Sequence, residues 1–198
     1  MMKDLFDFKK GFTKGLFKFG VREVVALGIG AALFFVLGRF VSVPTFVPNT
    51  NVETAYAFLA LLAVVFGPIV ACLAGFIGHA LKDFTMYGGT WWSWIITSAA
   101  VGFIIGTAKN LIDIKGGEFG YKQIITFNCA QFVANAVGWF LIAPTLDVII
   151  YAEPADKVYL QGLVAGVGNI VTVAIIGTIL LFAYAKAIPK SGSLKKEE

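Results

Sequence analysis

The sequence predicts an all-α integral membrane protein, a bundle of six transmembrane helices with both termini in the cytoplasm. Of its 198 residues, 58% are hydrophobic and only 14% are charged, whereas soluble domains are about 45 to 50% apolar and about 25% charged. The apolar residues occur in long stretches, as membrane-spanning helices require. These figures exclude a soluble single domain and a disordered chain.

Six apolar stretches are expected to form the membrane domain, residues 21–188. Residues 1–20 form a basic cytoplasmic tail and residues 189–198 a charged cytoplasmic tail. The first apolar stretch is too long for the core of a signal peptide, so it is expected to remain in the protein as a helix. The expected spans are Val21–Val43, Val52–Phe66, Pro68–Lys82, Trp92–Leu111, Tyr121–Ala143 and Leu160–Ile188.

The first span contains small residues four positions apart, in the pairs Ala26/Gly30 and Gly28/Ala32. Small residues allow another helix to approach closely inside a membrane. The sequence leaves open whether that helix belongs to the same chain or to a partner protein. The loop that follows, Pro44 to Asn51, is stiffened by two prolines and contains Asn49 and Asn51. We expect it to act as a lid over a cavity.

The second and third spans are short, and they could form one long span interrupted at Gly67 and Pro68. The positive-inside rule decides between the alternatives. Six spans leave only Arg39, Lys82 and Lys157 outside and the other 13 of the 16 basic residues inside, whereas five spans divide them equally. The sequence therefore predicts six spans, with a tight turn at Gly67–Pro68 in which Pro68 opens a helix.

His79 and Lys82 lie near the outer end of the third span, at helical spacing with Asp83. They are candidates for a binding site. Alternatively, Lys82 and Asp83 form a local pair that only marks the membrane interface. Trp92 belongs to an aromatic cluster that follows. Such clusters often form an interfacial belt, and they also stack on flat heterocycles.

The fifth span contains Asn128, Gln131, Asn135 and Trp139 on one helical face. Uncharged amides at membrane depth face either neighbouring helices, where they act as glue, or a wet cavity. We favour a ligand-lining row because it points toward Trp139 at the outer end. Together with Asn49, Asn51, His79, Lys82 and Trp92, this row makes up the candidate substrate-binding site.

The sequence motifs of several kinds of enzyme are absent. The chain has no phosphate-binding loop, no nucleophile elbow and no His-Glu-x-x-His zinc pair, and His79 is its single histidine. Cys72 and Cys129 lie far apart within apolar segments, which disfavours a disulfide or zinc site. We therefore expect no enzyme, cofactor, metal or nucleic-acid partner. The outer segments hold more acidic than basic residues, which disfavours a strongly anionic ligand.

Several motifs in order resemble an uncharacterised family of bacterial membrane proteins that is similar to the substrate-binding S components of energy-coupling factor (ECF) transporters. The resemblance covers about Val21 to Ile188, and similar sequences are often labelled riboflavin-type. The motifs that match are the run Gly28–Val41, Pro48–Asn51, Phe66–Pro68, Gly78–Asp83 and Trp91–Trp94.

This resemblance implies a six-helix protein of the bacterial cell membrane that captures a vitamin-like molecule at the outer face. It also implies partners, namely a transmembrane coupling subunit and two ABC ATPases, which dock on a small-residue face of the first helix. Such a face is often Ala-x-x-x-Ala; here the matching positions are Ala26/Gly30 or Gly28/Ala32. The rival hypotheses are a stand-alone secondary transporter or channel for a small polar solute, and a membrane scaffold without a ligand.

Overall fold

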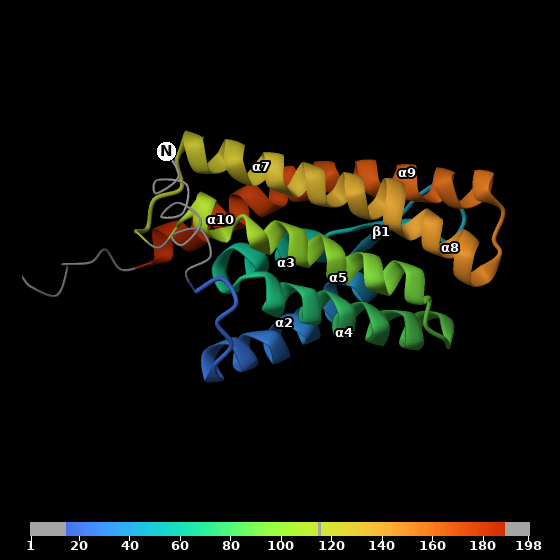
Figure 1. Cartoon of the computed structure of the whole chain (residues 1–198), viewed down its shortest axis with the longest axis horizontal. Coiled ribbons are helices and arrows are strands. Elements are labelled where there is room, and N and C mark those ends of the chain that lie inside the picture. Colours follow the sequence, from blue (N-terminus) through green and yellow to red (C-terminus); the bar gives the residue numbers. More distant parts are fainter. Residues whose placement is uncertain (1–14, 115, 189–198) are drawn as a thin grey trace, which may run out of the picture.

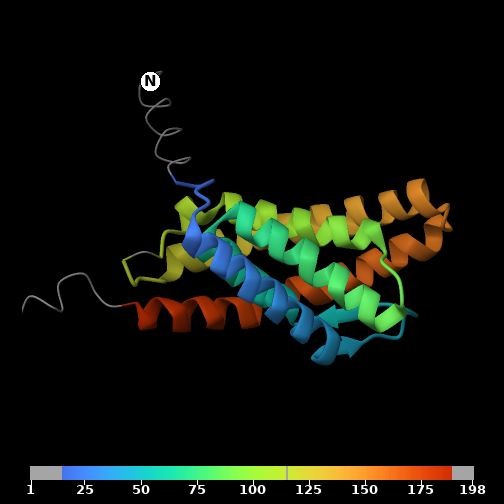
Figure 2. The same ribbon diagram turned by 90° about the horizontal axis from the view of Figure 1, so that it is seen from below.

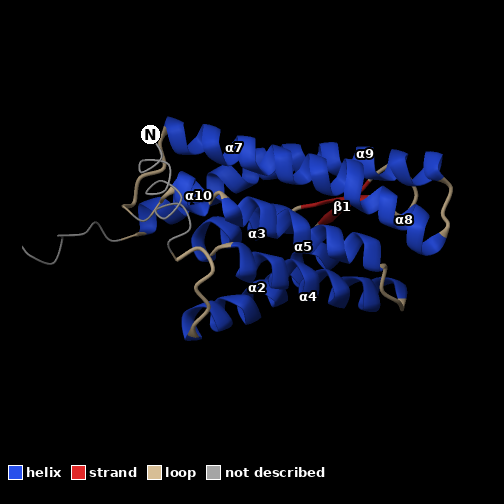
Figure 3. Ribbon diagram, in the orientation of Figure 1, coloured by secondary structure: helices blue, strands red, loops and turns tan. Residues whose placement is uncertain are grey.

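The structure, a computed structural model, describes residues 15–114 and 116–188. Helices make up most of this part of the chain and lie side by side along its long axis (Figure 1). The strands drawn in Figure 3 form one short antiparallel hairpin. The predicted all-α class is confirmed, and most of both predicted tails lies outside the described residues.

The elements follow one another along the chain, and Figure 1 labels most of them. They are α2 (Val21–Phe40), β1 (Ser42–Pro44), β2 (Asn51–Glu53), α3 (Ala55–Phe66), α4 (Pro68–Tyr87), α5 (Trp92–Thr107), α6 (Lys109–Ile112), α7 (Tyr121–Asn135), the π-helical segment η1 (Ala136–Ile142), α8 (Ala143–Tyr151), α9 (Ala155–Thr172), the π-helical segment η2 (Val173–Gly177) and α10 (Thr178–Ala187).

Five helical segments of the described chain are long and apolar enough to cross a membrane. They are α2, α4, α5 with α6, the 31-residue segment from Tyr121 to Tyr151, and the 33-residue segment from Ala155 to Ala187. All six predicted helices are present. The sixth is α3, whose 12 residues measure only about 18 Å at 1.5 Å per residue, less than the hydrocarbon thickness of about 30 Å.

The short helix α3 lies inside the bundle. None of its residues is exposed, and Ala55, Tyr56, Leu59 and Ala63 belong to the central apolar cluster. Neighbouring helices therefore surround α3 and provide its apolar environment. A helix shorter than the bilayer is permitted where protein, and not lipid, covers its ends.

The tight turn predicted between α3 and α4 is confirmed. Gly67 has φ +101°, and a Cβ at this position would lie 2.9 Å from the carbonyl oxygen of Leu16. Only glycine fits both the backbone conformation and the space. Pro68 occupies the first turn of α4, where its missing N–H has no helical partner to lose.

The β hairpin corrects two predicted boundaries. The first span was expected to reach Val43 and the second to begin at Val52, but these two residues pair with each other across β1 and β2. Figure 2 shows the hairpin beside the C-terminal end of α2. The predicted spans therefore end and begin a few residues too far into this connection.

The predicted fifth span also ends too early, at Ala143. Its helix continues to Tyr151, although Pro144 lacks the N–H of an ordinary helical hydrogen bond. The π-helical segment η1 precedes Pro144, and the N–H of Ala143 donates to the carbonyl of Gly138, five residues back. This wider turn accommodates the proline without ending the helix, so Asp147 lies on a helix and not in a loop.

Candidate functional site

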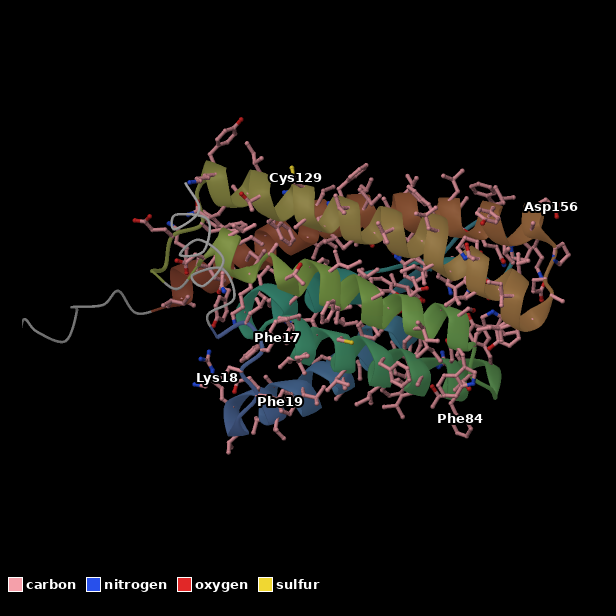
Figure 4. All side chains as sticks on the ribbon, in the orientation of Figure 1. Phe17, Lys18, Phe19, Phe84, Cys129 and Asp156 are labelled. Carbon is pink, nitrogen blue, oxygen red and sulfur yellow. The ribbon has the colours of Figure 1, made fainter. Side chains whose placement is uncertain are left out.

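A cavity of about 280 Å³ lies at one end of the bundle, where α4 ends and α9 begins. It is the end that Phe84 and Asp156 mark in Figure 4, opposite the end marked by Lys18. The hairpin, α4, α5, α8 and α9 all contribute to it. The residues that line it are Asn49, Asn51, Glu53, His79, Lys82, Asp83, Tyr87, Gly89, Trp91, Trp94, Asp147, Glu153, Lys157, Val158 and Gln161.

A buried ion pair joins the hairpin to α4 at the bottom of the cavity. Nζ of Lys82 lies 2.6 Å from Oε1 of Glu53 and 3.6 Å from Oδ1 of Asp83. The remaining Glu53 oxygen, Oε2, is buried and has no hydrogen-bond partner. Two buried carboxylates thus share one buried ammonium group.

His79 extends this network toward the centre of the bundle. Its Nε2 lies 3.3 Å from Oδ1 of Asp83, and its Nδ1 lies 2.5 Å from Oγ of Ser98, which also contacts the hydroxyl of Tyr56 at 2.7 Å. The Ser–His–Asp order imitates a hydrolase triad. However, Ser98 is completely buried and does not line the cavity, so no substrate bond could reach its oxygen.

Asp147 organises the aromatic wall of the cavity. Its Oδ1 accepts hydrogen bonds from Nε1 of Trp91 at 2.6 Å and from the hydroxyl of Ser93, and its Oδ2 accepts one from Nε1 of Trp94 at 2.7 Å. The carboxylate is 1% exposed. It therefore fixes the orientation of both indole rings.

The hairpin loop closes one side of the cavity and is tied to α9. Nε2 of Gln161 donates to the carbonyl of Pro48 at 2.9 Å, and Oδ1 of Asn169 accepts from the backbone N–H of Glu53 at 3.1 Å. Asn49 and Asn51 line the cavity from this loop.

Four of the predicted site residues line this cavity: Asn49, Asn51, His79 and Lys82. Trp92 does not line it. Trp92 is 45% exposed and stacks on Phe76 with ring centroids 6.1 Å apart. Trp91, the residue before α5, lines the cavity together with Trp94. Within α5, Trp94 points about 200° away from Trp92, so Trp92 faces away from the cavity.

The amide row of the fifth span also does not line the cavity, which corrects the expectation that it borders one. The row forms a continuous chain of hydrogen bonds instead. Asn128 donates to Oγ1 of Thr178, Gln131 to the carbonyl of Ile170, Asn135 to Oε1 of Gln131, and Trp139 to Oδ1 of Asn135.

Three of the four residues in this row, Gln131, Asn135 and Trp139, are buried inside the protein. Gln131 and Asn135 are 2% and 0% exposed, and the partners of the row lie on α7, on α9 and on α10. At Gly162, α9 approaches so closely that a Cβ would lie 2.2 Å from the carbonyl oxygen of Trp139. This arrangement is that of interhelical glue, the alternative that the sequence left open.

The two small-residue pairs of α2 have different surroundings. Ala26 and Gly30 are buried, and a Cβ on Gly30 would lie 2.5 Å from Cδ1 of Leu62. Gly28 and Ala32 are exposed, and a Cβ on Gly28 would meet nothing within 4 Å. The first pair packs inside the bundle, and the second lies on an outer face.

Some residues that line the cavity were not among the predicted site residues, most notably Asp147 and Gln161. Asp147 lies beyond Ala143, where the predicted fifth span ended. A carboxylate that stands alone in an apolar run from Leu141 to Tyr151 is the signal that could have identified it.

Comparison with known proteins identifies the family. Residues 18–186 match the family model described as ECF-type riboflavin transporter, S component. The chain is 56% identical to a UPF0397 protein of Clostridium perfringens over 180 residues, which are 91% of this chain and 97% of that protein. It is 56% identical to one of an Exiguobacterium species over 90% of this chain and 98% of that protein.

A UPF0397 protein of Staphylococcus aureus is 55% identical, over 89% of this chain and 96% of that protein. The five long apolar helices and the family match together indicate a membrane protein that belongs to a transporter, and not to an enzyme family. The chain belongs to the family of S components of ECF-type riboflavin transporters.

Proposed function

We propose that this protein is the substrate-binding component of an ECF-type importer in a bacterial cell membrane, and that it binds a vitamin or related micronutrient at the outer face. The observation that supports this most directly is the cavity beneath the hairpin. It combines aromatic rings with a few converging polar groups, as small-molecule sites do.

The proposed orientation places both termini in the cytoplasm and the cavity outside. Lys18, Arg22, Lys109, Lys122 and Lys186 belong to segments at the end of the bundle opposite the cavity. An excess of basic residues is typical of the cytoplasmic side. In this orientation α3 and the hairpin together complete a sixth crossing.

The proposed partners are a transmembrane coupling subunit and two ABC ATPases. We place the docking face at Gly28 and Ala32, because they are the small residues of α2 that no other helix in the described part of the chain covers. Ala26 and Gly30 are proposed to hold α2 against α3 and α4 instead.

The function is tested by purifying the protein in nanodiscs and identifying retained small molecules by mass spectrometry. Isothermal calorimetry against a vitamin panel that includes riboflavin then gives the affinity. We expect saturable binding of one compound. Uptake should require co-expressed coupling and ATPase subunits; uptake by proteoliposomes that contain this chain alone would instead support the rival stand-alone transporter.

Docking is tested with bulky substitutions on α2. Gly28→Leu and Ala32→Leu should reduce co-purification with the coupling subunit and leave ligand affinity unchanged. Cys129→Leu is the matched control, since Cys129 is a small exposed residue on α7 (Figure 4). Equal co-purification of all three variants would contradict the proposed docking face.

A further inference from the structure

We infer that the cavity selects a ligand with a cationic nitrogen, such as an amidinium, an ammonium or a quaternised ring nitrogen, and that Asp147 is the counter-ion that sets this preference. The inference rests on the proposed function, since it names the substrate class of the same cavity. It follows from a surplus of negative charge, from the surroundings of Asp147, and from the way the indole rings are held.

The cavity lining holds more negative than positive charge. At the rim, Lys157 and Glu153 form their own pair at 2.6 Å and neutralise each other. Deeper in the cavity, the carboxylates of Glu53, Asp83 and Asp147 face the ammonium group of Lys82 and the imidazole of His79. The three negative charges of these carboxylates outnumber the positive charges, which are two if His79 is protonated and one if it is neutral.

Asp147 is the carboxylate without a cation. Among the residues that the structure describes, none forms an ion pair with it, and its three hydrogen bonds come from neutral donors. Burial of a charge without a counter-charge is costly. A cation bound nearby would remove this cost, so the site gains more from a cationic ligand than from a neutral one.

The same hydrogen bonds prepare the aromatic wall for a cation. Because Asp147 accepts the N–H groups of Trp91 and Trp94, these indoles have no donor left to offer a ligand. What they offer are electron-rich ring faces, and a carboxylate at the N–H edge increases that electron density. Trp is the side chain that attracts cations most strongly through its ring face.

The experiment uses three probes of the same shape on the full chain. Benzamidinium, benzamide and benzoate share a phenyl ring and a planar head group, and they are cationic, neutral and anionic at pH 7. Binding is followed by tryptophan fluorescence and saturation-transfer NMR. The nanodiscs consist of phosphatidylglycerol, whose headgroup contains no cationic nitrogen, so lipid cannot supply the cation.

We expect benzamidinium to bind roughly tenfold more tightly than benzamide, and benzoate to bind most weakly. Asp147→Asn should abolish the difference between benzamidinium and benzamide. Asp156→Asn, which changes an exposed carboxylate outside the cavity lining, should preserve it. If Asp147→Asn does not yield folded protein, the wild-type series still decides whether the cavity prefers a cation.

Equal affinities for benzamidinium and benzamide in the wild type would overturn the inference, and so would a preference that persists in Asp147→Asn. A neutral or anionic molecule retained on purification would overturn it too, while the proposed function would stand. If no small molecule is retained and neither the three probes nor any vitamin of the panel binds saturably, the proposed function falls as well.

Discussion

The cavity and the amide row are two polar regions of one apolar bundle, and they differ in how their hydrogen-bonding capacity is used. In the amide row, four side chains each donate to an acceptor within the protein: Asn128, Gln131, Asn135 and Trp139. In the cavity, Glu53 keeps an unpartnered oxygen and Asp147 lacks a cation. Of these two polar regions, only the cavity keeps polar groups uncompensated by the described protein, and this difference is why the ligand site is proposed there.

The largest expected effect comes from the buried ion pair of Lys82 with Glu53 and Asp83 in the cavity lining. Lys82→Met should destabilise the protein by about 3 to 5 kcal/mol, because it leaves the buried carboxylates of Glu53 and Asp83 without their cation. The measurement is reversible unfolding in detergent. Adding Glu53→Gln to Lys82→Met should recover part of the loss; if the single variant is as stable as the wild type, the pair does not stabilise the fold.

In the amide row, the expected effect is on stability and not on binding. Asn135→Ala removes the acceptor of the Trp139 indole and should cost about 1 to 3 kcal/mol. Ligand affinity, measured by calorimetry with the compound that the protein retains, should stay within about twofold, a change of less than 0.5 kcal/mol. A large loss of ligand affinity at unchanged stability would show that the amide row belongs to the binding site.

The cavity should respond in the opposite way. Asn51→Ala should lower ligand affinity roughly tenfold, about 1.4 kcal/mol, because it removes a polar group from the hairpin side of the cavity. The unfolding midpoint should hardly change, since no described residue hydrogen-bonds to this side chain. Asn128→Ala is the matched control for an amide outside the cavity.

The smallest effect is expected at Trp92. Trp92→Phe keeps an aromatic ring against Phe76 on the outer surface, and surface substitutions usually change stability by less than about 0.5 kcal/mol. Both the unfolding midpoint and the ligand affinity should stay near wild-type values. A marked loss of affinity would show that Trp92 turns into the cavity when ligand binds.

The sequence allowed much of the fold to be predicted, because apolar length and basic residues report directly on a membrane environment. Six helices and the Gly67–Pro68 turn follow from these signals. The continuation of a helix through Pro144 does not, because it depends on the π-helical hydrogen bond of Ala143 to Gly138. Hydropathy alone cannot show that bond.

For the site, sequence reasoning placed Asn49, Asn51, His79 and Lys82 at the cavity. It misplaced the amide row, because helical spacing shows that residues share a face and does not show which surface that face meets. Asn135 and Trp139 satisfy each other four residues apart. The role of Asp147 could not be predicted, because it depends on the indoles of Trp91 and Trp94, which lie more than fifty residues away in the sequence.

Because most residues of α3 are buried and none is exposed, α3 offers less surface to acyl chains than the other helices do. Hydrophobic mismatch therefore acts on this molecule mainly through its peripheral helices, which tilt when the bilayer thins or thickens. Substitutions in α3 should obey the rules of a water-soluble core, in which shape decides the outcome and lipid composition does not.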